Sequence, residues 1–129
     1  MFESRVERQI EAAHHNGPPE SKCYTNHGHS WKVIVVFQYP NSVVSLSKYG
    51  WGPDFHDVKR IIDEYDHKDL NDKMGAGIPP SAENLARVLY DQFSIKLGFK
   101  PKYVELHEGS GNSVRYTRDE RNDRKRSHT

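Results

Sequence analysis

Hydrophobic and polar positions alternate along the first fourteen residues of the chain. The inward parity comprises Val6, Ile10, Ala12 and His14. A period of two is typical of a half-buried strand, so this segment predicts a strand whose buried face ends at a histidine. A second run from Ser30 to Tyr39 is β-branched and aromatic and predicts another strand. The inward face of this second strand is expected to carry Trp31, Val33, Val35 and Phe37.

The spacing of apolar residues changes to three and four in two later segments, which is typical of amphipathic helices. The first helix is predicted to begin after the N-cap Asp54 and to end near Asp66. A connection rich in glycine and proline follows from Met74 to Pro80. The second helix is predicted to begin after Ser81 and to stop at Gly98. Its apolar stripe consists of Leu85, Leu89, Phe93 and Leu97.

Two short segments, Tyr103 to Glu108 and Ser113 to Tyr116, predict final strands joined by a turn-rich loop. Strands that flank a pair of helices favour an α+β domain, with both helices on one face of an antiparallel sheet. Residues 117–129 are charged or polar and contain no apolar side chain. We therefore expect one domain at residues 1–116, followed by a mobile tail at residues 117–129.

The composition narrows the class of protein. With 129 residues, 34% of them hydrophobic, the chain is long enough for one domain with its own core. A formal net charge of +1 gives no overall field for nucleic acid or a membrane surface, so neither is an expected partner. The single cysteine excludes an internal disulfide, and the first residues lack the apolar stretch of a signal peptide. We expect a cytoplasmic protein.

Three histidines form a candidate metal site. His27 and His29 are two positions apart and so share one strand face, while His14 has the matching parity on the neighbouring strand. Three neutral imidazoles on one tetrahedral ion leave its fourth position open, as in catalytic zinc sites. Surface histidines without any metal are the alternative that this pattern leaves open.

Two other positions suggest proton transfer. Cys23 precedes His27 by four residues, and a nearby cation favours the reactive thiolate, although an isolated cysteine is more often a small buried hydrophobe. The neighbours Asp66 and His67 form either a histidine at a helix end beside a favourable charge, or a pair in which the carboxylate orients the imidazole for proton relay.

Glu108 shares parity with Val104 and Leu106 and therefore ends a buried strand face. An unpaired carboxylate there would be costly, so a partner is expected. An arginine of this protein is one solution. The other is a ligand with two adjacent N–H donors, such as a guanine-like or pterin ring, which would engage both carboxylate oxygens.

These residues belong to a series of motifs that spans the chain up to Tyr116. The motifs are Ala12-Ala13-His14, Cys23-x-x-x-His27-Gly28-His29, Gly50-x-x-x-Asp54-Phe55, Asp66-His67-Lys68-x-Leu70-Asn71, Pro80-Ser81-x-Glu83-Asn84-Leu85-Ala86 and the strand from Val104 to Glu108. In this order the chain resembles the 6-pyruvoyltetrahydropterin synthase family. The three-residue gap between Cys23 and His27 is similar to that of the bacterial 6-carboxytetrahydropterin synthase branch, which acts in 7-deazaguanine and queuosine biosynthesis.

The resemblance implies a T-fold: four antiparallel strands with two helices on one face, in the order ββααββ. It also implies a homo-oligomer, a trimer or hexamer, with active sites at subunit interfaces. By residue, the resemblance implies that zinc is bound by His14, His27 and His29, that protons are transferred by Cys23, Asp66 and His67, and that the pterin ring is anchored by Glu108.

The reaction implied is the zinc-dependent conversion of 7,8-dihydroneopterin triphosphate to 6-carboxy-5,6,7,8-tetrahydropterin, with release of acetaldehyde and triphosphate. No external redox cofactor is expected, because the electrons move within the substrate. Lys22, Lys32 and Lys68 are candidates for binding the triphosphate. The alternatives are a synthase that forms the 6-pyruvoyl product, and a zinc- and pterin-binding module without turnover.

Overall fold

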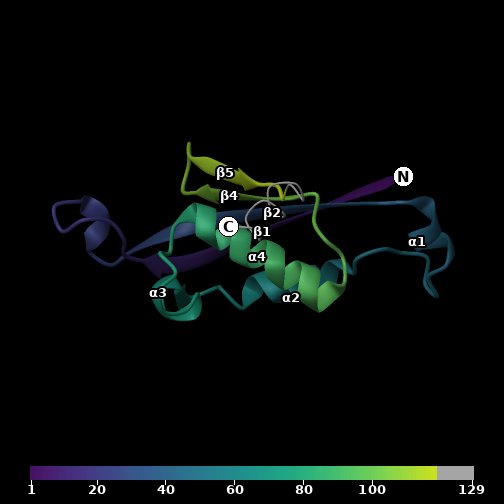
Figure 1. The fold of residues 1–129 in the computed structure, drawn as a ribbon, viewed down its shortest axis with the longest axis horizontal. Helices are drawn as coiled ribbons and strands as arrows, with labels where there is room; N and C mark the ends of the chain where they lie inside the picture. The colour runs from purple at the N-terminus through teal and green to yellow at the C-terminus, as the bar shows by residue number, and fades with distance from the viewer. Residues whose placement is uncertain (119–129) are drawn as a thin grey trace, which may run out of the picture.

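The computed structural model of the protein describes residues 1–118 (Figure 1). The strands of this part are β1 (Phe2–His14), β2 (His27–Tyr39), β3 (Lys68–Asp69), β4 (Tyr103–Glu108) and β5 (Ser113–Tyr116). Its helices are α1 (Asn41–Ser45), α2 (Phe55–Asp63), α3 (Leu70–Lys73) and α4 (Ala82–Leu97), and a short 3-10 turn, η1, covers Lys22–Tyr24.

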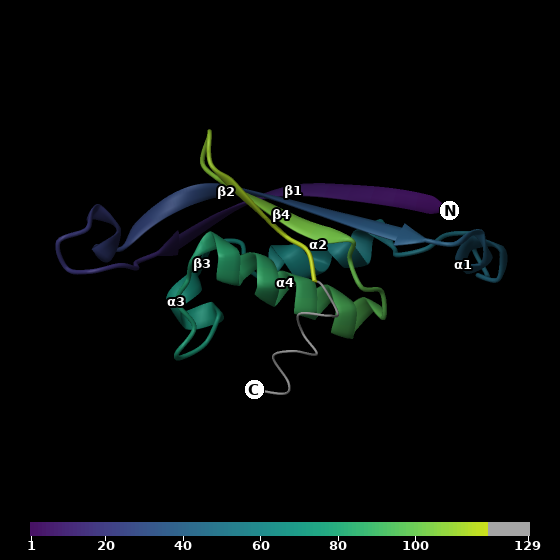
Figure 2. The same ribbon diagram turned by 45° about the horizontal axis from the view of Figure 1, so that its top comes forward.

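The strands form a single sheet in the order β3-β1-β2-β4-β5. β1 and β2 pair antiparallel along their whole length, from Phe2 opposite Tyr39 to His14 opposite His27. β4 joins β2, and β5 joins β4, also antiparallel. The two longer helices, α2 and α4, lie on the same face of the sheet, as Figure 2 shows. The prediction of an α+β domain with both helices on one face is therefore confirmed.

The predicted count of four antiparallel strands and two helices is wrong for the described residues. The sheet there is mixed and has five strands, because β3 pairs parallel to β1, with Ala12 opposite Lys68. Two residues are too few to show an alternating pattern, so this strand has no signature in the sequence. The extra helices α1 and α3 are single turns within connections, and α3 begins where the Asp69 side chain accepts a hydrogen bond from the Asn71 N–H.

The caps of the two longer helices follow the sequence prediction. The Asp54 carboxylate accepts hydrogen bonds from two N–H groups in the first turn of α2, and the Ser81 hydroxyl accepts one from Asn84 at the start of α4. Gly98 ends α4 with φ of 73°, a left-handed conformation that favours glycine. Within residues 1–118, no helix combines the length and the apolar character that crossing a bilayer requires.

The core lies between the sheet and these two helices. The inward side chains of β1 and β2 are buried as the alternation predicts, and Trp31 is fully buried beneath the end of β1. They pack against α2 and against the stripe of α4, where Leu85, Leu89 and Phe93 are also fully buried. Arg8 of β1 binds both carboxylate oxygens of Asp63, at 2.9 Å each, and so fastens the end of α2 to the sheet.

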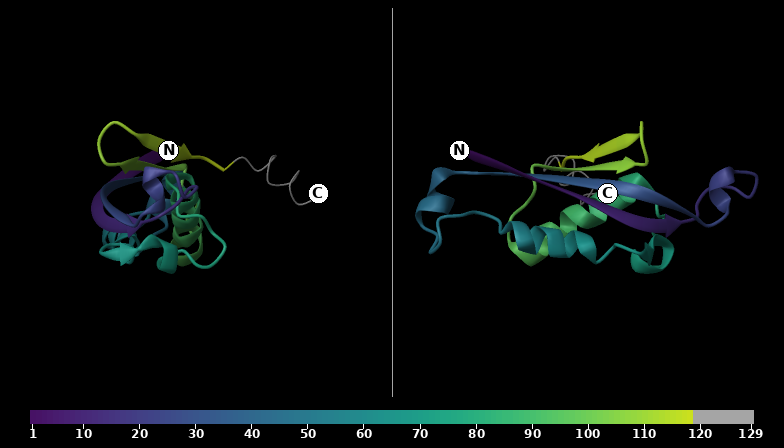
Figure 3. Two further views of the ribbon diagram at one scale, coloured as in Figure 1. Left: turned by 90° about the vertical axis from the view of Figure 1, so that its left-hand side faces the viewer. Right: turned by 180° about the vertical axis from the view of Figure 1, so that it is seen from behind.

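The two ends of the long β1–β2 hairpin differ. The loop between the strands, residues 15–26, projects beyond the sheet at one end, and α1 lies at the other (Figure 3).

After β5, Arg118 donates to Asp91 at 2.7 Å and stacks over the Tyr90 ring. Residues 119–129, which form most of the predicted tail, lie outside the described part of the chain, so the mobile tail stays a prediction.

Candidate active site

The end of the β1–β2 ladder brings the three histidines together. His14 is opposite His27 in the register, and His29 is two residues further along β2 on the same face. One ring nitrogen from each histidine lies within 4.8 Å of those of the other two. His14 is 5% exposed, although it is a polar residue. The strand pairing alone therefore brings three potential metal ligands together.

Main-chain carbonyls fix which nitrogen faces the cluster in two of the three rings. His14 Nδ1 lies 2.7 Å from the carbonyl oxygen of Pro80, and His27 Nδ1 lies 2.7 Å from that of Thr25. Since a carbonyl only accepts, both Nδ1 atoms donate and the lone pair of each ring is on Nε2. His14 Nε2 is buried and has no hydrogen-bond partner among the described residues. This is the arrangement of metal-binding histidines, whose second nitrogen is held by an outer partner.

The environment of His29 also favours the neutral ring. Burial lowers the pKa of His29, and the neighbouring His14 and His27 add to that effect, while the Glu108 carboxylate opposes it. The fully buried Trp31 lies under the cluster, with its ring centroid 5.2 Å from that of His14 and 5.6 Å from that of His29. A neutral imidazole is the form that binds a metal, so the donor set fits zinc.

Glu108 meets the histidine cluster rather than an arginine. Its Oε1 lies 3.1 Å from His29 Nε2, but that nitrogen makes no hydrogen bond of acceptable geometry. Glu108 is therefore close to His29 without a hydrogen bond to it, which leaves the carboxylate able to bind a ligand. Beside Glu108 is a cavity of about 230 Å³ between the start of α4 and the β4–β5 hairpin, lined in part by Leu106, Asn112 and Val114.

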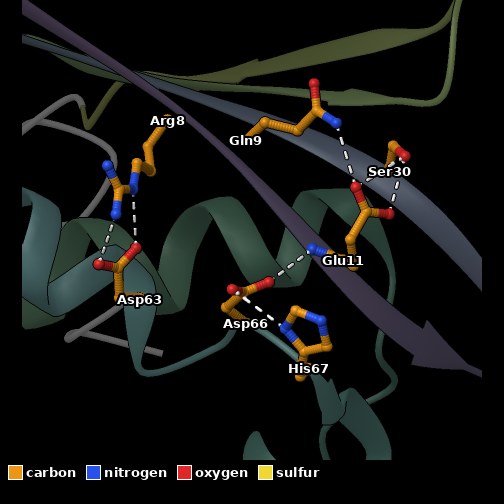
Figure 4. Close-up of polar contacts among 7 residues, drawn as sticks. All are labelled: Arg8, Gln9, Glu11, Ser30, Asp63, Asp66 and His67. Carbon is orange, nitrogen blue, oxygen red and sulfur yellow. Dashed lines mark hydrogen bonds and ion pairs between the residues drawn. The ribbon is translucent and has the colours of Figure 1, made fainter.

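Asp66 and His67 form an ion pair at the edge of β1 (Figure 4). His67 Nδ1 lies 3.1 Å from Asp66 Oδ2, and the main chain of Glu11 holds both residues. The Glu11 N–H donates to Asp66 Oδ1 at 2.8 Å, and the Glu11 carbonyl accepts from the His67 N–H at 2.6 Å. The hydrogen bond from Glu11 is the main reason that the pKa of Asp66 is lowered.

His67 adopts an unusual backbone conformation, with φ of 56°. A left-handed conformation is uncommon for residues other than glycine, and it is frequent at functional sites. The His67 side chain is 80% exposed. α2 ends at Asp63, so His67 lies beyond the helix and is not a residue of its last turn. The backbone thus presents this imidazole to the outside of the protein while its carboxylate partner stays against β1.

An open cavity of about 530 Å³ lies beside His67 at the edge of the sheet. His29 of the cluster and His67 of the ion pair both line it, together with Lys68 and the Glu11–Ser30 pair of the sheet. The Ser30 hydroxyl donates to the two carboxylate oxygens of Glu11, at 2.8 and 3.0 Å. Glu11 and Ser30 have the opposite parity to His29 in the β1–β2 register, so this cavity lies on the sheet face away from the histidine cluster.

Cys23 is exposed on η1 in the loop between β1 and β2, so it is not a buried hydrophobe. The loop is held locally: the Asn16 N–H donates to the Cys23 carbonyl at 2.7 Å, and the Cys23 N–H donates to the Ser21 hydroxyl at 3.1 Å. Within residues 1–118, no hydrogen bond or ion pair joins Cys23 to the three histidines or to Asp66 and His67. The thiol is the one predicted site residue that the described chain leaves apart.

Sequence reasoning missed the groups that orient these side chains. The carbonyls of Pro80 and Thr25 and the main chain of Glu11 carry no side-chain signature. The one available signal is Pro80, which stands within a quoted motif. Main-chain acceptors become visible only when the fold brings distant segments together.

Comparison with known proteins identifies the family. A sequence profile of the 6-pyruvoyl tetrahydropterin synthase family matches residues 3–119. The chain belongs to this family. The resemblance inferred from the separated motifs is thus confirmed, whereas a search of curated proteins found no matching sequence.

Solved structures share the fold of this family member at low sequence identity. The 6-pyruvoyl tetrahydropterin synthase of Caenorhabditis elegans superposes with a TM-score of 0.70 at 19% identity, over 92% of this chain and 98% of that one. The enzyme of Plasmodium vivax gives 0.63 at 16% identity, over the same shares of the two chains. An uncharacterized protein from Wolinella succinogenes gives 0.59 at 18% identity, again over 92% and 98%. The T-fold is therefore confirmed, with the additional short strand described above.

Proposed function

We propose that this family member is a zinc-dependent lyase that converts 7,8-dihydroneopterin triphosphate to 6-carboxy-5,6,7,8-tetrahydropterin, releasing acetaldehyde and triphosphate, in 7-deazaguanine and queuosine biosynthesis. The observation that carries the proposal is the convergence of His14, His27 and His29, with carbonyl partners on two of the rings. Membership of a pterin synthase family supports the class of substrate.

The three histidines would hold the zinc ion, and the fourth coordination position would remain for the substrate. When bound, zinc supplies Lewis acidity, which makes adjacent C–H and O–H protons easier to remove and stabilises developing negative charge. The rings contribute by their fixed orientation, because Pro80 and Thr25 hold two of them from behind. Such preorganisation avoids rearrangement of the ligands during the reaction.

Glu108 would bind the pterin ring through its two adjacent N–H donors. Its contact with His29 supports this role, since a ring anchored on Glu108 would extend its hydroxylated side chain toward the histidine cluster. The Glu108 side chain is 31% exposed, so water can solvate the carboxylate before a ligand arrives.

Cys23 and the Asp66–His67 pair would move protons on and off the substrate side chain. Asp66 would orient the His67 imidazole for proton transfer, and Cys23 would act as a base. Cys23 and His67 are both exposed and are not in contact within one chain. We therefore extend the proposal to a homo-oligomer, a trimer or hexamer, in which copies of the chain meet at the active site.

Lys68 is the best placed of the three candidate lysines for the triphosphate. It lines the same cavity as His29 and His67, whereas Lys22 lies on η1 and Lys32 lies within β2. A lysine ammonium is a suitable point charge for phosphate oxygens. In this arrangement the polyphosphate would lie at the open edge of the cavity.

The second candidate function is synthesis of the 6-pyruvoyl product, which the names of the family and of its solved relatives favour. The test is to incubate the zinc-loaded protein with 7,8-dihydroneopterin triphosphate and to identify the products by mass. Acetaldehyde with 6-carboxytetrahydropterin supports the proposal, and 6-pyruvoyltetrahydropterin without acetaldehyde supports the second function. Normal zinc and pterin binding without either product would establish a binding module instead.

A further inference from the structure

The pairing of β1 with both of its neighbouring strands ends beside His14, one of the three proposed metal ligands. On one edge the pairing ends with His14 opposite His27, and on the other it ends with Ala13 opposite Asp69. The next residue, His15, therefore has no strand partner for its main chain. A metal-binding residue at the end of a strand can separate from the sheet unless another group replaces the missing hydrogen bonds.

The Asn71 side chain makes two hydrogen bonds to the main chain of His15 in place of the missing strand pairing. Its Oδ1 accepts from the His15 N–H at 2.9 Å, and its Nδ2 donates to the His15 carbonyl at 3.0 Å. A carboxamide offers one donor and one acceptor, as a peptide group does, so Asn71 continues the β3 edge by one step. Asn71 is itself held, because its N–H donates to the capping carboxylate of Asp69 at 3.0 Å.

A second asparagine holds the residue next to the carbonyl that orients the His14 ring. Asn84 Nδ2 donates to the Pro79 carbonyl at 2.9 Å, and the Ser81 N–H donates to the same oxygen at 2.9 Å. The following residue, Pro80, provides the oxygen that lies 2.7 Å from His14 Nδ1. Asn84 stands in the first turn of α4, so it ties the Pro79–Pro80 segment to a rigid helix.

We propose that Asn71 and Asn84 are positioning residues of the metal site: Asn71 holds the main chain beside His14, and Asn84 holds the Pro79–Pro80 segment, whose Pro80 carbonyl orients the His14 ring. The inference rests on the proposed zinc function and names two residues that determine how tightly zinc is held. Removal of an outer partner of a metal-ligating histidine typically weakens metal binding about 10- to 100-fold.

The two supports act on different parts of one ligand. Loss of the Asn71 carboxamide frees the strand end, and loss of Asn84 frees the ring orientation, so each Asn→Ala substitution is expected to weaken zinc binding roughly 10-fold or more. Since both act through His14, the double variant should bind zinc more weakly than either single variant. A merely structural role would lower stability of the metal-free protein without changing affinity.

The experiment measures zinc affinity by competition with a chromophoric chelator, on the full-length protein and on Asn71→Ala and Asn84→Ala. Asn41→Ala is the matched control, because Asn41 begins α1 at the far end of the sheet and its side chain accepts from the N-terminal amine. Melting temperatures of the metal-free proteins, measured in parallel, report the structural effect separately. The expected result is weaker zinc binding in both site variants and unchanged binding in the control.

A cobalt(II) spectrum gives a second readout that stability does not move. Displacement of the His14 ring should change the visible ligand-field bands of the cobalt-loaded variants relative to those of the control. Asn71→Asp keeps the acceptor for the His15 N–H and loses the donor to its carbonyl, so its affinity should lie between wild type and Asn71→Ala. If Asn71→Ala does not fold, this conservative variant and Asn84→Ala decide the question.

The outcomes separate this inference from the proposed function. If the wild-type protein binds no zinc at the three histidines, the proposed function fails, and this inference fails with it. If wild type binds zinc and the asparagine variants match Asn41→Ala in affinity and cobalt spectrum, then only the positioning role is overturned.

Discussion

The two groups of candidate catalytic residues are built in different ways. The histidine cluster stands on the paired strands β1 and β2, above the fully buried Trp31, with two rings fixed by carbonyls. Cys23 and His67 instead are exposed, one on a loop and the other at the sheet edge in a left-handed conformation.

The contrast separates two physical tasks. A metal site needs ligands whose positions are fixed before the ion arrives, and a strand ladder over a packed core provides that rigidity. Proton transfer needs access to the substrate, and the exposed Cys23 and His67 suit this proposed task, because a substrate or another copy of the chain can reach them. Substitutions in the two groups should therefore differ in their effect on metal binding.

The largest effect is expected at the cluster itself. His27→Ala removes one of three ligands and should weaken zinc binding more than the roughly 100-fold that loss of an outer partner can cost. Pterin synthase activity should disappear with the metal. Zinc content and chelator competition measure this, and His56→Ala, at an exposed helix histidine, is the control. Full zinc content in His27→Ala would contradict the assignment of the cluster.

Cys23→Ala tests the exposed group of candidate proton-transfer residues. Loss of a general base should reduce kcat by about 100- to 10,000-fold, while zinc content stays at the wild-type level. Steady-state rates with 7,8-dihydroneopterin triphosphate and metal analysis of the same sample provide the measurement. Loss of zinc from this variant would mean that the thiol is a ligand, and the division between the two groups would fail.

Asp66→Asn sharpens the comparison within the proton-transfer group. The charged hydrogen bond to His67 is lost, and kcat should fall roughly 10- to 100-fold with zinc binding unchanged. Asp63→Asn is a useful control because Asp63 pairs with Arg8 and touches neither histidine site. Equal losses of activity in both variants would point to general damage at the edge of the sheet.

Glu108→Gln tests the carboxylate beside the histidine cluster. The amide keeps one acceptor and loses the charge, so KM for the pterin substrate should rise about tenfold, with a smaller change in kcat. Zinc affinity should change little, since Glu108 contacts His29 without a hydrogen bond. An unchanged KM would remove Glu108 from the ring-binding role.

The smallest effect concerns stability and pH. The pKa of Asp66 is lowered in the folded protein, so its interactions stabilise the fold above the pKa of the unfolded chain. This contribution is lost as the pH falls through the lowered folded pKa. Urea unfolding of wild type and Asp66→Asn should thus show a difference at neutral pH that shrinks in acid. If the difference in unfolding free energy between the two proteins does not depend on pH, packing and not the Asp66 charge is its cause.

Much of the fold can be predicted from local patterns, because three boundaries of the two longer helices have a chemical marker, whereas α2 ends at Asp63 and not near Asp66 as predicted. Asp54, Ser81 and Gly98 each fix one boundary, and the final hairpin matches the predicted ranges at both strands. β3 could not be predicted, since its two residues pair only because the chain leaving α2 meets the free edge of β1. Long-range pairing of so short a segment leaves no periodicity.

The candidate site was also predictable only in part from the sequence. Parity placed His14, His27 and His29 on one face, and the strand register brings them together. Parity also placed Glu108 at the end of an inward face, but it could not identify His29 as the neighbour, because that contact depends on how β4 aligns with β2. The distance of Cys23 from the other residues depends on a loop whose path no pattern encodes.

The unbroken register of β1 and β2 limits how the length of this chain can change. Because every residue from Phe2 to His14 pairs with one from His27 to Tyr39, inserting or deleting a single residue within either strand would turn the following side chains to the opposite face. A one-residue insertion before His14 would move its ring away from its two companions. The projecting loop at residues 15–26 has no such restriction on its length, so homologues should concentrate their gaps there and not in the strands on either side.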